Sequence, residues 1–231
     1  MKLTKLFSIF VILLLAAIPV LAENPVVEDQ IAIRHANLDQ MHYGLSMLGE
    51  GFVAYIAQIG GDTTKLQSIL DDFNAKRDPL LNANTHAEIN VHMDQARILI
   101  ESFIAEYNTQ ITAKNGKPAE GLIKAFDNLN QHKDEYDAKI DNYWSVRKEK
   151  SIEIYDTQLS QAQEFVDWFK TQGYDTTKLQ QILDSIDAKQ PELIAAIDER
   201  NEIKIQGTLA DIAIKVQALG AEADRLLKQG K

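Results

Sequence analysis

Apolar residues recur every three or four positions along most of the chain. Across residues 27–59 the spacing alternates between three and four with one miss, at Arg34, which is the pattern of a heptad seam. The sustained alternation of apolar and polar residues that is typical of strands does not occur. The pattern therefore predicts an all-α protein with helices at about residues 26–59, 64–113, 118–172 and 177–229.

The predicted connections, near residues 60, 116 and 174, are short, and short connections favour antiparallel neighbours. Pro79 and Pro191 fall inside the second and fourth predicted helices, and each is expected to kink or interrupt its helix. We expect an elongated antiparallel four-helix bundle built from two duplicated long helical hairpins, at residues 23–116 and 117–231. An arrangement of two stacked hairpins that share long helices stays open.

Two segments of the chain match each other without a gap. Residues 52–76 read FVAYIAQIGGDTTKLQSILDDFNAK, residues 165–189 read FVDWFKTQGYDTTKLQQILDSIDAK, and 14 of the 25 positions are identical. Two helix turns can converge on similar chemistry, because a turn is chemically constrained. The turn does not require Lys65, Gln67 or Asp71, however, and these match as well. We interpret the match as a tandem duplication of a unit of about 100 residues, which is too long for a solenoid repeat.

The matching segments carry the signals of a helix–turn–helix. Gly173 stands where a helix needs a left-handed residue, and Tyr174 can contact Phe169 as in a Schellman motif. Thr177 is expected to be the N-cap of the next helix, with Gln180 completing a T-x-x-Q capping box. The first segment has Gly60, Thr64 and Gln67 in the same roles, and Gly61 in place of the tyrosine.

The turn motif G-[GY]-D-T-T-K-L-Q between long amphipathic helices resembles turns of exported helical proteins of archaea, which are mostly uncharacterised. The resemblance covers about 25 residues in each segment. Because the motif is chiefly a capping signature, the resemblance implies an element of the fold and no activity.

Residues 1–22 have the three parts of a secretory signal peptide. Lys2 and Lys5 precede an apolar run at residues 6–18, and Pro19 ends the run before Ala22. A spanning helix needs roughly 20 apolar residues, so cleavage before Glu23 is favoured over retention as an anchor. We expect a secreted or extracytoplasmic protein, in the periplasm or at the cell surface, with no membrane span after cleavage.

The composition narrows the possible functions. The absence of cysteine excludes disulfides, thiolate metal sites, cysteine nucleophiles and a lipoprotein anchor. A formal net charge of −10 argues against nucleic acid as a partner. The chain has no G-x-S-x-G, P-loop or dinucleotide-binding glycine motif. The sequence therefore favours a non-enzymatic structural or interaction module, with self-association or an unknown protein as its partner and with no cofactor.

A metal-binding function is the alternative. Histidine and aspartate stand at i, i+4 and i+7 on the first predicted helix, and glutamate and histidine at i, i+4 on the second, so each set shares one face of its helix. Pairing the helices about residue 62 brings the sets level, where they can bind Zn²⁺ or another divalent ion. Equally, they can be ordinary boundary residues. The candidate ligands are His35, Glu88 and His92, with Asp39 and His86 near by.

Two further features suit either packing or function. The aromatic residues between 136 and 169 have helical spacing that fits core positions, and Trp144 is the one most expected to be exposed and to meet a partner. Gly44, Gly49 and Gly51 cluster within a predicted helix. A close approach of helices, or a bend, explains them more simply than a small cavity opposite Phe52 and Tyr55.

Overall fold

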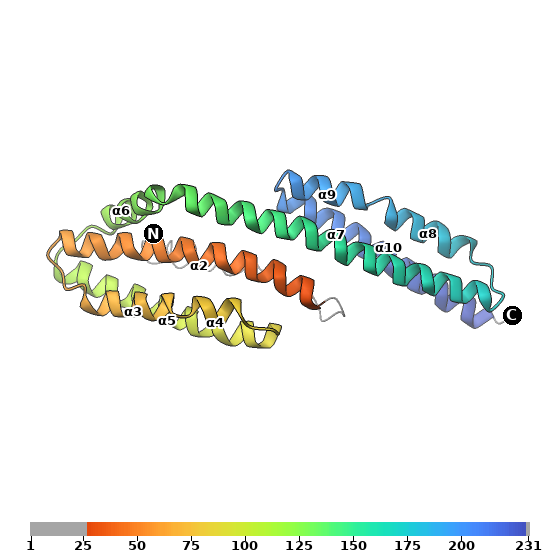
Figure 1. The fold of residues 1–231 in the computed structure, drawn as a ribbon, viewed down its shortest axis with the longest axis horizontal. Helices are drawn as coiled ribbons and strands as arrows, with labels where there is room; N and C mark the ends of the chain where they lie inside the picture. Colours follow the sequence, from red (N-terminus) through yellow and green to blue (C-terminus); the bar gives the residue numbers. More distant parts are fainter. Residues whose placement is uncertain (1–26, 230–231) are drawn as a thin grey trace. The chain divides into compact units, whose positions relative to one another are not determined.

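The computed structural model describes residues 27–229 of the chain. These residues form helices joined by short turns, with no strand among them, which confirms the predicted all-α class. The predicted signal peptide, residues 1–22, lies outside the described residues. In chain order the helices are α2 (Val27–Gln58), α3 (Thr64–Asn74), α4 (Arg77–Leu81), α5 (His86–Ala113), α6 (Pro118–Gln131), α7 (Lys133–Thr171), α8 (Thr177–Asp187), α9 (Gln190–Asp198) and α10 (Glu202–Gln229) (Figure 1).

The two predicted helices that contain proline are each broken into three. The helix α4 begins two residues before Pro79, and α9 begins one residue before Pro191. Proline fits the first turn of a helix because the backbone N–H groups there have no intrahelical partner. The predicted interruptions are therefore confirmed. The sequence pattern does not predict the later breaks at residues 82–85 and 199–201, or the break at His132.

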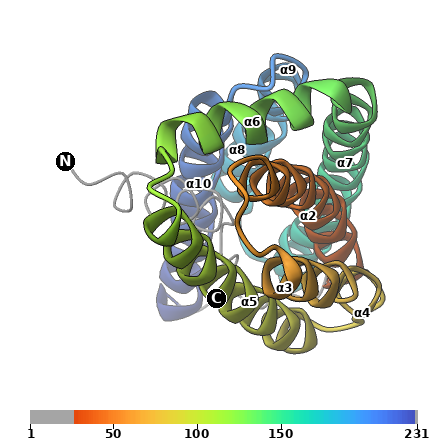
Figure 2. The same ribbon diagram turned by 90° about the vertical axis from the view of Figure 1, so that its left-hand side faces the viewer.

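Contacts divide the chain into two compact units. Unit 1 ends at Tyr143 and unit 2 begins at Trp144, so the boundary lies inside α7. In unit 1, α2 lies between α6 on one side and α3, α4 and α5 on the other (Figure 2). In unit 2, α10 packs along α8 and α9. The predicted hairpin boundary, between residues 116 and 117, follows the sequence duplication and stays a prediction.

The turn from α2 to α3 and the turn from α7 to α8 have the same backbone geometry. Gly60 and Gly173 adopt left-handed φ angles of +72° and +84°. The backbone N–H of Tyr174 donates to the carbonyl oxygen of Phe169 at 3.1 Å, and the N–H of Gly61 makes the equivalent bond at 2.8 Å. The rings of Tyr174 and Phe169 also meet edge to face, with centroids 5.4 Å apart. These are the expected Schellman bonds and apolar contact.

The predicted capping box is wrong, because an aspartate two residues earlier caps the helix. Thr177 is the first residue of α8, and its backbone N–H donates to Asp175 Oδ1 at 3.0 Å. Thr64 N–H donates to Asp62 Oδ1 at 2.9 Å in the same way. The side chain of Gln180 instead donates to side chains of α8 and α7. A carboxylate binds an N–H more strongly than a hydroxyl does, and its charge suits the positive end of the helix dipole.

Equivalent helix ends in the two units lie a nearly constant number of residues apart along the chain. The helices α2 and α7 end 113 residues apart, and α3 and α8 both begin and end 113 residues apart. Between α5 and α10 the separation is 116 residues at both ends. We call residues at these separations counterparts. The change of three residues arises because α9 has four residues more than α4, while the link before α10 is one residue shorter than the link before α5.

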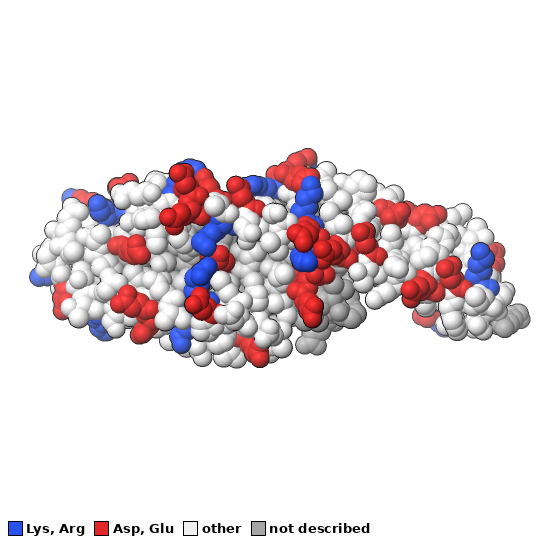
Figure 3. All heavy atoms as spheres, in the orientation of Figure 1, with Lys and Arg blue, Asp and Glu red and all other residues white. Residues whose placement is uncertain are grey.

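Charged side chains are spread over the surface. Figure 3 shows acidic residues along the face in view, with basic residues between them. None of the described helices has the length and apolar character needed to cross a membrane. The absence of nucleic-acid binding stays a prediction, which rests on the net charge of −10.

Candidate functional site

Two of the predicted metal-binding carboxylates have other partners. Glu88 Oε2 accepts a hydrogen bond from the backbone N–H of Asn84 at 2.8 Å, so this side chain closes the start of α5. Asp39 forms ion pairs with Arg77 and Lys139, each at 2.7 Å. Burial opposes ionisation of Asp39, but hydrogen bonds from Lys139 and Arg77 outweigh it and hold the pKa below its usual range.

Two of the candidate histidines, His35 and His86, lie near the cation Arg34. His86 Nδ1 is 3.2 Å from Arg34 Nη1. Burial lowers the pKa of His35, and the charge of Arg34 lowers it further, against a backbone hydrogen bond at Ala83. One ring nitrogen in each of His35, His86 and His92 is buried without a hydrogen-bond partner. Across residues 27–229, no three histidine or carboxylate side chains are grouped closely enough to hold a metal ion, so the metal site stays a prediction.

On the face of α2 that carries His35 and Asp39, His42 has a clear structural role. Its Nε2 lies 3.0 Å from the carbonyl oxygen of Phe73, and its ring stacks on the Phe73 ring with centroids 4.3 Å apart. A carbonyl oxygen only accepts, so Nε2 carries the proton. Tyr155, the counterpart of His42, donates its hydroxyl to the carbonyl oxygen of Ile186, the counterpart of Phe73. The two side chains therefore fix the ends of α3 and α8 in the same way.

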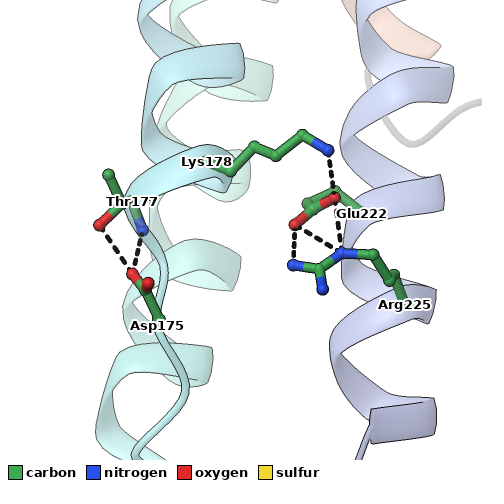
Figure 4. Close-up of polar contacts among 5 residues, drawn as sticks. All are labelled: Asp175, Thr177, Lys178, Glu222 and Arg225. Atoms are coloured by element: carbon green, nitrogen blue, oxygen red, sulfur yellow. Dashed lines mark hydrogen bonds and ion pairs between the residues drawn. The ribbon is translucent and has the colours of Figure 1, made fainter.

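Each unit also contains a buried glutamate that pairs with a lysine. Glu106 of α5 accepts from Lys65 at 2.8 Å, and Glu222 of α10 accepts from Lys178 at 2.8 Å. Arg225 donates to both oxygens of Glu222 as well (Figure 4). These bonds, led by those from Arg225 and Lys178, lower the pKa of Glu222 to about 2. Through these ion pairs Glu106 joins α5 to α3, and Glu222 joins α10 to α8.

The ungapped match between the two halves of the sequence does not reveal this shared ion pair. The lysines are 113 residues apart, but the glutamates are 116 apart, because α9 is longer than α4. Aligning the last helices separately, with a shift of three residues, brings Glu106 and Glu222 into register.

Unit 1 contains an apolar groove between α2, α3 and α5. Its main cavity has a volume of about 50 Å³, and a second cavity of about 30 Å³ shares Leu45, Phe73 and Ile100 with it. The second cavity extends the groove toward Leu38 and Met93. Aliphatic and aromatic side chains and one glycine line the main cavity, namely Leu45, Leu48, Gly49, Phe52, Ile69, Leu70, Phe73, Leu99, Ile100, Phe103 and Ile104.

The glycine cluster on α2 allows close packing. A Cβ atom on Gly51 would lie 2.5 Å from the Cα of Ala125 in α6, and one on Gly44 would lie 3.0 Å from the ring of Tyr136. The close helix approach is therefore confirmed at Gly51. A small cavity is present as well, but Gly49 and Phe52 line it and Tyr55 does not.

Unit 2 exposes apolar side chains over much of α10. Its outward residues include Ile203 and Ile214, which are 83% and 64% exposed. A Cβ atom on Gly207 or Gly220 would meet no atom within 4 Å, so packing within the chain does not require these glycines. The exposed apolar residues and glycines define what we call the α10 face, namely Ile203, Gly207, Leu209, Ala210, Ala213, Ile214, Val216, Ala218, Gly220, Ala221 and Leu227.

The corresponding surface of α5 carries ion pairs beside exposed apolar residues. Arg97 lies 3.4 Å from Asp94 and 3.2 Å from Glu101, in a ladder of exposed ion pairs, while Val91 and Ile98 are exposed as well. The counterparts of Asp94, Arg97 and Glu101 are Ala210, Ala213 and Gln217. The two surfaces therefore differ chiefly in this ion-pair ladder, which the α10 face lacks.

The most exposed tryptophan is not the expected one. Trp144 is half-buried against the core of unit 2, and its ring lies 5.1 Å from the Arg147 guanidinium. Trp168 is 49% exposed, and Phe165 beside it is 41% exposed. The aromatic surface of α7 is thus at Phe165 and Trp168.

Comparison of the chain with protein-family models, with curated proteins and with solved structures finds no match.

Proposed function

We propose that the chain is an exported, non-enzymatic helical-bundle protein that acts as a structural or interaction module, and that the α10 face is its binding surface. The observation that carries the proposal is the exposure of this face. Contiguous exposed apolar surface is typical of interaction sites. A helix that is apolar beyond the stripe facing its own core is normally covered by a further partner.

The ion pairs of α5 support the same conclusion. Polar side chains at the counterpart positions are compatible with this helical scaffold, so alanine in α10 is not required for packing within the chain. Small residues also let a second helix approach closely. A helix of a second copy, or of another exported protein, is a partner of suitable shape.

We propose further that the two hairpins arose by duplication and form an elongated antiparallel four-helix bundle. Three observations support this: the identities between residues 52–76 and 165–189, the equal separation of helix ends, and the lysine–glutamate pair in each unit. The heptad seam favours coiled-coil-like packing of the long helices. Kinship with exported archaeal helical proteins stays a prediction from the turn motif.

Export is proposed from residues 1–22. Intact-mass measurement of the natural protein tests it, because cleavage yields a chain that begins near Glu23. A mass that includes residues 1–22, together with recovery from the membrane fraction, would contradict cleavage.

Site-specific photo-crosslinking tests the binding surface. A photoreactive amino acid replaces Ala213 on the α10 face, and the matched control replaces its counterpart Arg97 on α5. In cells that export the protein, we expect a discrete adduct from position 213 and none from position 97. The adduct mass distinguishes self-association from another partner. Equal yields at the two positions, or none at either, would contradict the proposal.

The alternative function, binding of a divalent ion by His35, Glu88 and His92, stays a prediction. The positive charge of Arg34 beside His86 opposes a second cation there. Calorimetric titration of the tag-free mature chain with Zn²⁺ decides it. Binding tighter than about millimolar that is lost in the double variant His35→Ala, His92→Ala would favour the metal site.

A further inference from the structure

Arg34 of α2 is a cation without an acidic partner. Its Nη atoms contact His86 Nδ1 at 3.2 Å, Asn90 Oδ1 at 2.5 Å and Met93 Sδ at 3.2 Å, and none of these three groups is a carboxylate. Its Nε–H is buried without an acceptor. No carboxylate among residues 27–229 lies within ion-pair distance of it. Because a buried donor without an acceptor is costly, an anion with free oxygen atoms would stabilise this site.

The apolar groove of unit 1 leads to this cation. The main cavity and the second cavity share Leu45, Phe73 and Ile100, so they lie in series. Met93 lines the far part of the second cavity and is itself in contact with Arg34. The lining from Leu38 to Phe52 on α2 covers about 21 Å at 1.5 Å per residue. A long apolar path therefore ends at an unpaired positive charge.

The two cavities are small. Their volumes are about 50 and 30 Å³, whereas a cavity of roughly 150 Å³ encloses a benzene ring, so neither encloses a ligand as it stands. Half-buried aliphatic side chains, among them Leu45, Leu99 and Ile104, border the main cavity, so a ligand would lie along the groove with one side exposed. Met41 and Met93 border the second cavity, and flexible thioethers adapt readily to a ligand. A flexible unbranched hydrocarbon chain can follow such a groove, whereas a rigid ring needs an enclosed site.

Three positions of the apolar lining are polar in unit 2. The counterparts of Leu45, Leu48 and Leu99 there are Gln158, Gln161 and Lys215, whereas most other lining positions remain apolar. Lys215 donates to Ser185 there at 3.2 Å. The helical hairpin thus accepts polar side chains at these three positions.

From the groove and the unpaired cation together, we propose that unit 1 binds a single-chain anionic amphiphile such as a fatty acid. The hydrocarbon chain lies in the groove between α2, α3 and α5, and Arg34 binds the carboxylate, with His86 beside it. This inference concerns unit 1 alone and is independent of the proposed role of the α10 face.

The test is a titration of the mature chain at pH 8 with three ligands that share one tail: decanoate, 1-decanol and decyltrimethylammonium. Methyl chemical shifts of leucine and isoleucine report the site, and all concentrations stay below micelle formation. We expect decanoate to bind at least tenfold more tightly than 1-decanol, and the ammonium to bind most weakly. Affinity should rise about fourfold for each methylene from octanoate to decanoate.

Matched variants separate the head-group site from the tail site. Arg34→Gln should remove the advantage of decanoate and leave 1-decanol binding unchanged. Arg97→Gln is the control, because Arg97 also borders the second cavity but has Asp94 and Glu101 as partners. The double variant Leu45→Gln, Leu99→Lys, which introduces the residues of unit 2, should weaken both ligands at least tenfold.

The inference would be overturned by any of three results. These results are decanoate binding that is no tighter than 1-decanol binding, a loss of affinity in Arg97→Gln as large as that in Arg34→Gln, and the absence of shifts at Leu45 and Leu99. Circular dichroism confirms that each variant is folded. If the double variant does not fold, Leu99→Lys alone carries the same expectation.

Discussion

The C-terminal parts of α2 and α7 lie in the two matching segments, which both start with Phe-Val. Aromatic side chains at equivalent positions of these two helices nevertheless have opposite environments. Phe52 and Tyr55 of α2 are buried, at 4% and 2% exposure, whereas their counterparts Phe165 and Trp168 are exposed. In unit 1 the hydroxyl of Tyr55 accepts a hydrogen bond from the backbone N–H of Lys117 at 2.9 Å, at the start of α6. The difference therefore comes from what covers the helix and not from the hairpin itself.

The residues around these aromatic side chains have changed accordingly. Gly51 lies under α6, and its counterpart Glu164 is exposed. Tyr107 packs edge to face on Phe52 with centroids 4.8 Å apart, and its counterpart on α10 is Ala223. One hairpin sequence thus supports either a covered or an uncovered helix face, according to a few positions outside the turn.

The largest effect is expected where α6 meets α2. Gly51→Leu should destabilise the protein by about 3 kcal/mol, because its side chain would meet the backbone of Ala125 and force α6 away. The matched change Glu164→Leu lies on an exposed surface and should alter stability by no more than about 0.5 kcal/mol. Denaturant unfolding measures both. Equal effects would mean that α6 does not cover α2.

The second-largest effect on stability is expected for the buried glutamates, and it should differ between the two units. Glu222 receives charged donors from Lys178 and Arg225, whereas Glu106 receives Lys65 and the neutral amide of Gln110. Glu222→Gln should therefore lower the unfolding midpoint more than Glu106→Gln does. A carboxyl group whose folded pKa is depressed stabilises the fold above its unfolded pKa, and this contribution is lost as the pH falls through the folded value.

The pH window follows from those pKa values. The wild-type advantage over Glu222→Gln should be complete at pH 6 and should decline between about pH 4.3, the unfolded value, and about pH 2, to which the pKa of Glu222 is lowered. Thermal unfolding at a series of pH values checks this. An advantage that is independent of pH would show that the charge of Glu222 does not matter.

A smaller and equal effect is expected in the two turns. Gly60→Ala and Gly173→Ala should each cost about 1 kcal/mol, because both glycines have positive φ while a Cβ atom would have free space. The control is Gly207→Ala within α10, where alanine should stabilise by up to about 1 kcal/mol. Unequal losses at the two turns would break the correspondence between the hairpins.

Much of the fold follows from the sequence because local rules determine it. The apolar spacing predicts the helices, the glycines predict the left-handed turn residues, and the prolines predict two interruptions. The capping prediction is wrong at Thr177 because Asp175 offers a charged acceptor to the same helix start. Two of the later breaks follow α4 and α9, which differ in length by four residues, and the pattern holds no signal for where either helix ends.

The candidate site was less predictable, because it depends on partners from distant parts of the chain. Spacing places Asp39 on one face with His35 and His42, but it does not reveal that Arg77 and Lys139 neutralise Asp39. The miss at Arg34 in the heptad seam marks the cation that borders the apolar groove. Its meaning depends on its contacts with His86, Asn90 and Met93, which only the structure provides.

The smallest effect is expected where histidine and tyrosine have the same role. His42→Tyr introduces the residue that unit 2 already uses, since Tyr155 donates to the carbonyl oxygen that corresponds to that of Phe73. The hydrogen bond is kept in the variant, so stability at pH 7 should change by less than about 1 kcal/mol.

The pH dependence of that variant is more informative than its stability at pH 7. Burial lowers the pKa of His42, against the hydrogen bond to Phe73, so this imidazole takes up a proton less readily in the folded protein than in the unfolded chain. Below the unfolded pKa of about 6.5 the unfolded state binds more protons, and stability falls as the pH drops.

His42→Tyr should make this loss shallower between pH 7 and pH 5, while His35, whose pKa is also lowered, keeps part of it. Thermal unfolding of both proteins across this range measures the slopes. An unchanged slope would mean that protonation of His42 does not oppose folding, and that the two units differ less at this position than their side chains imply.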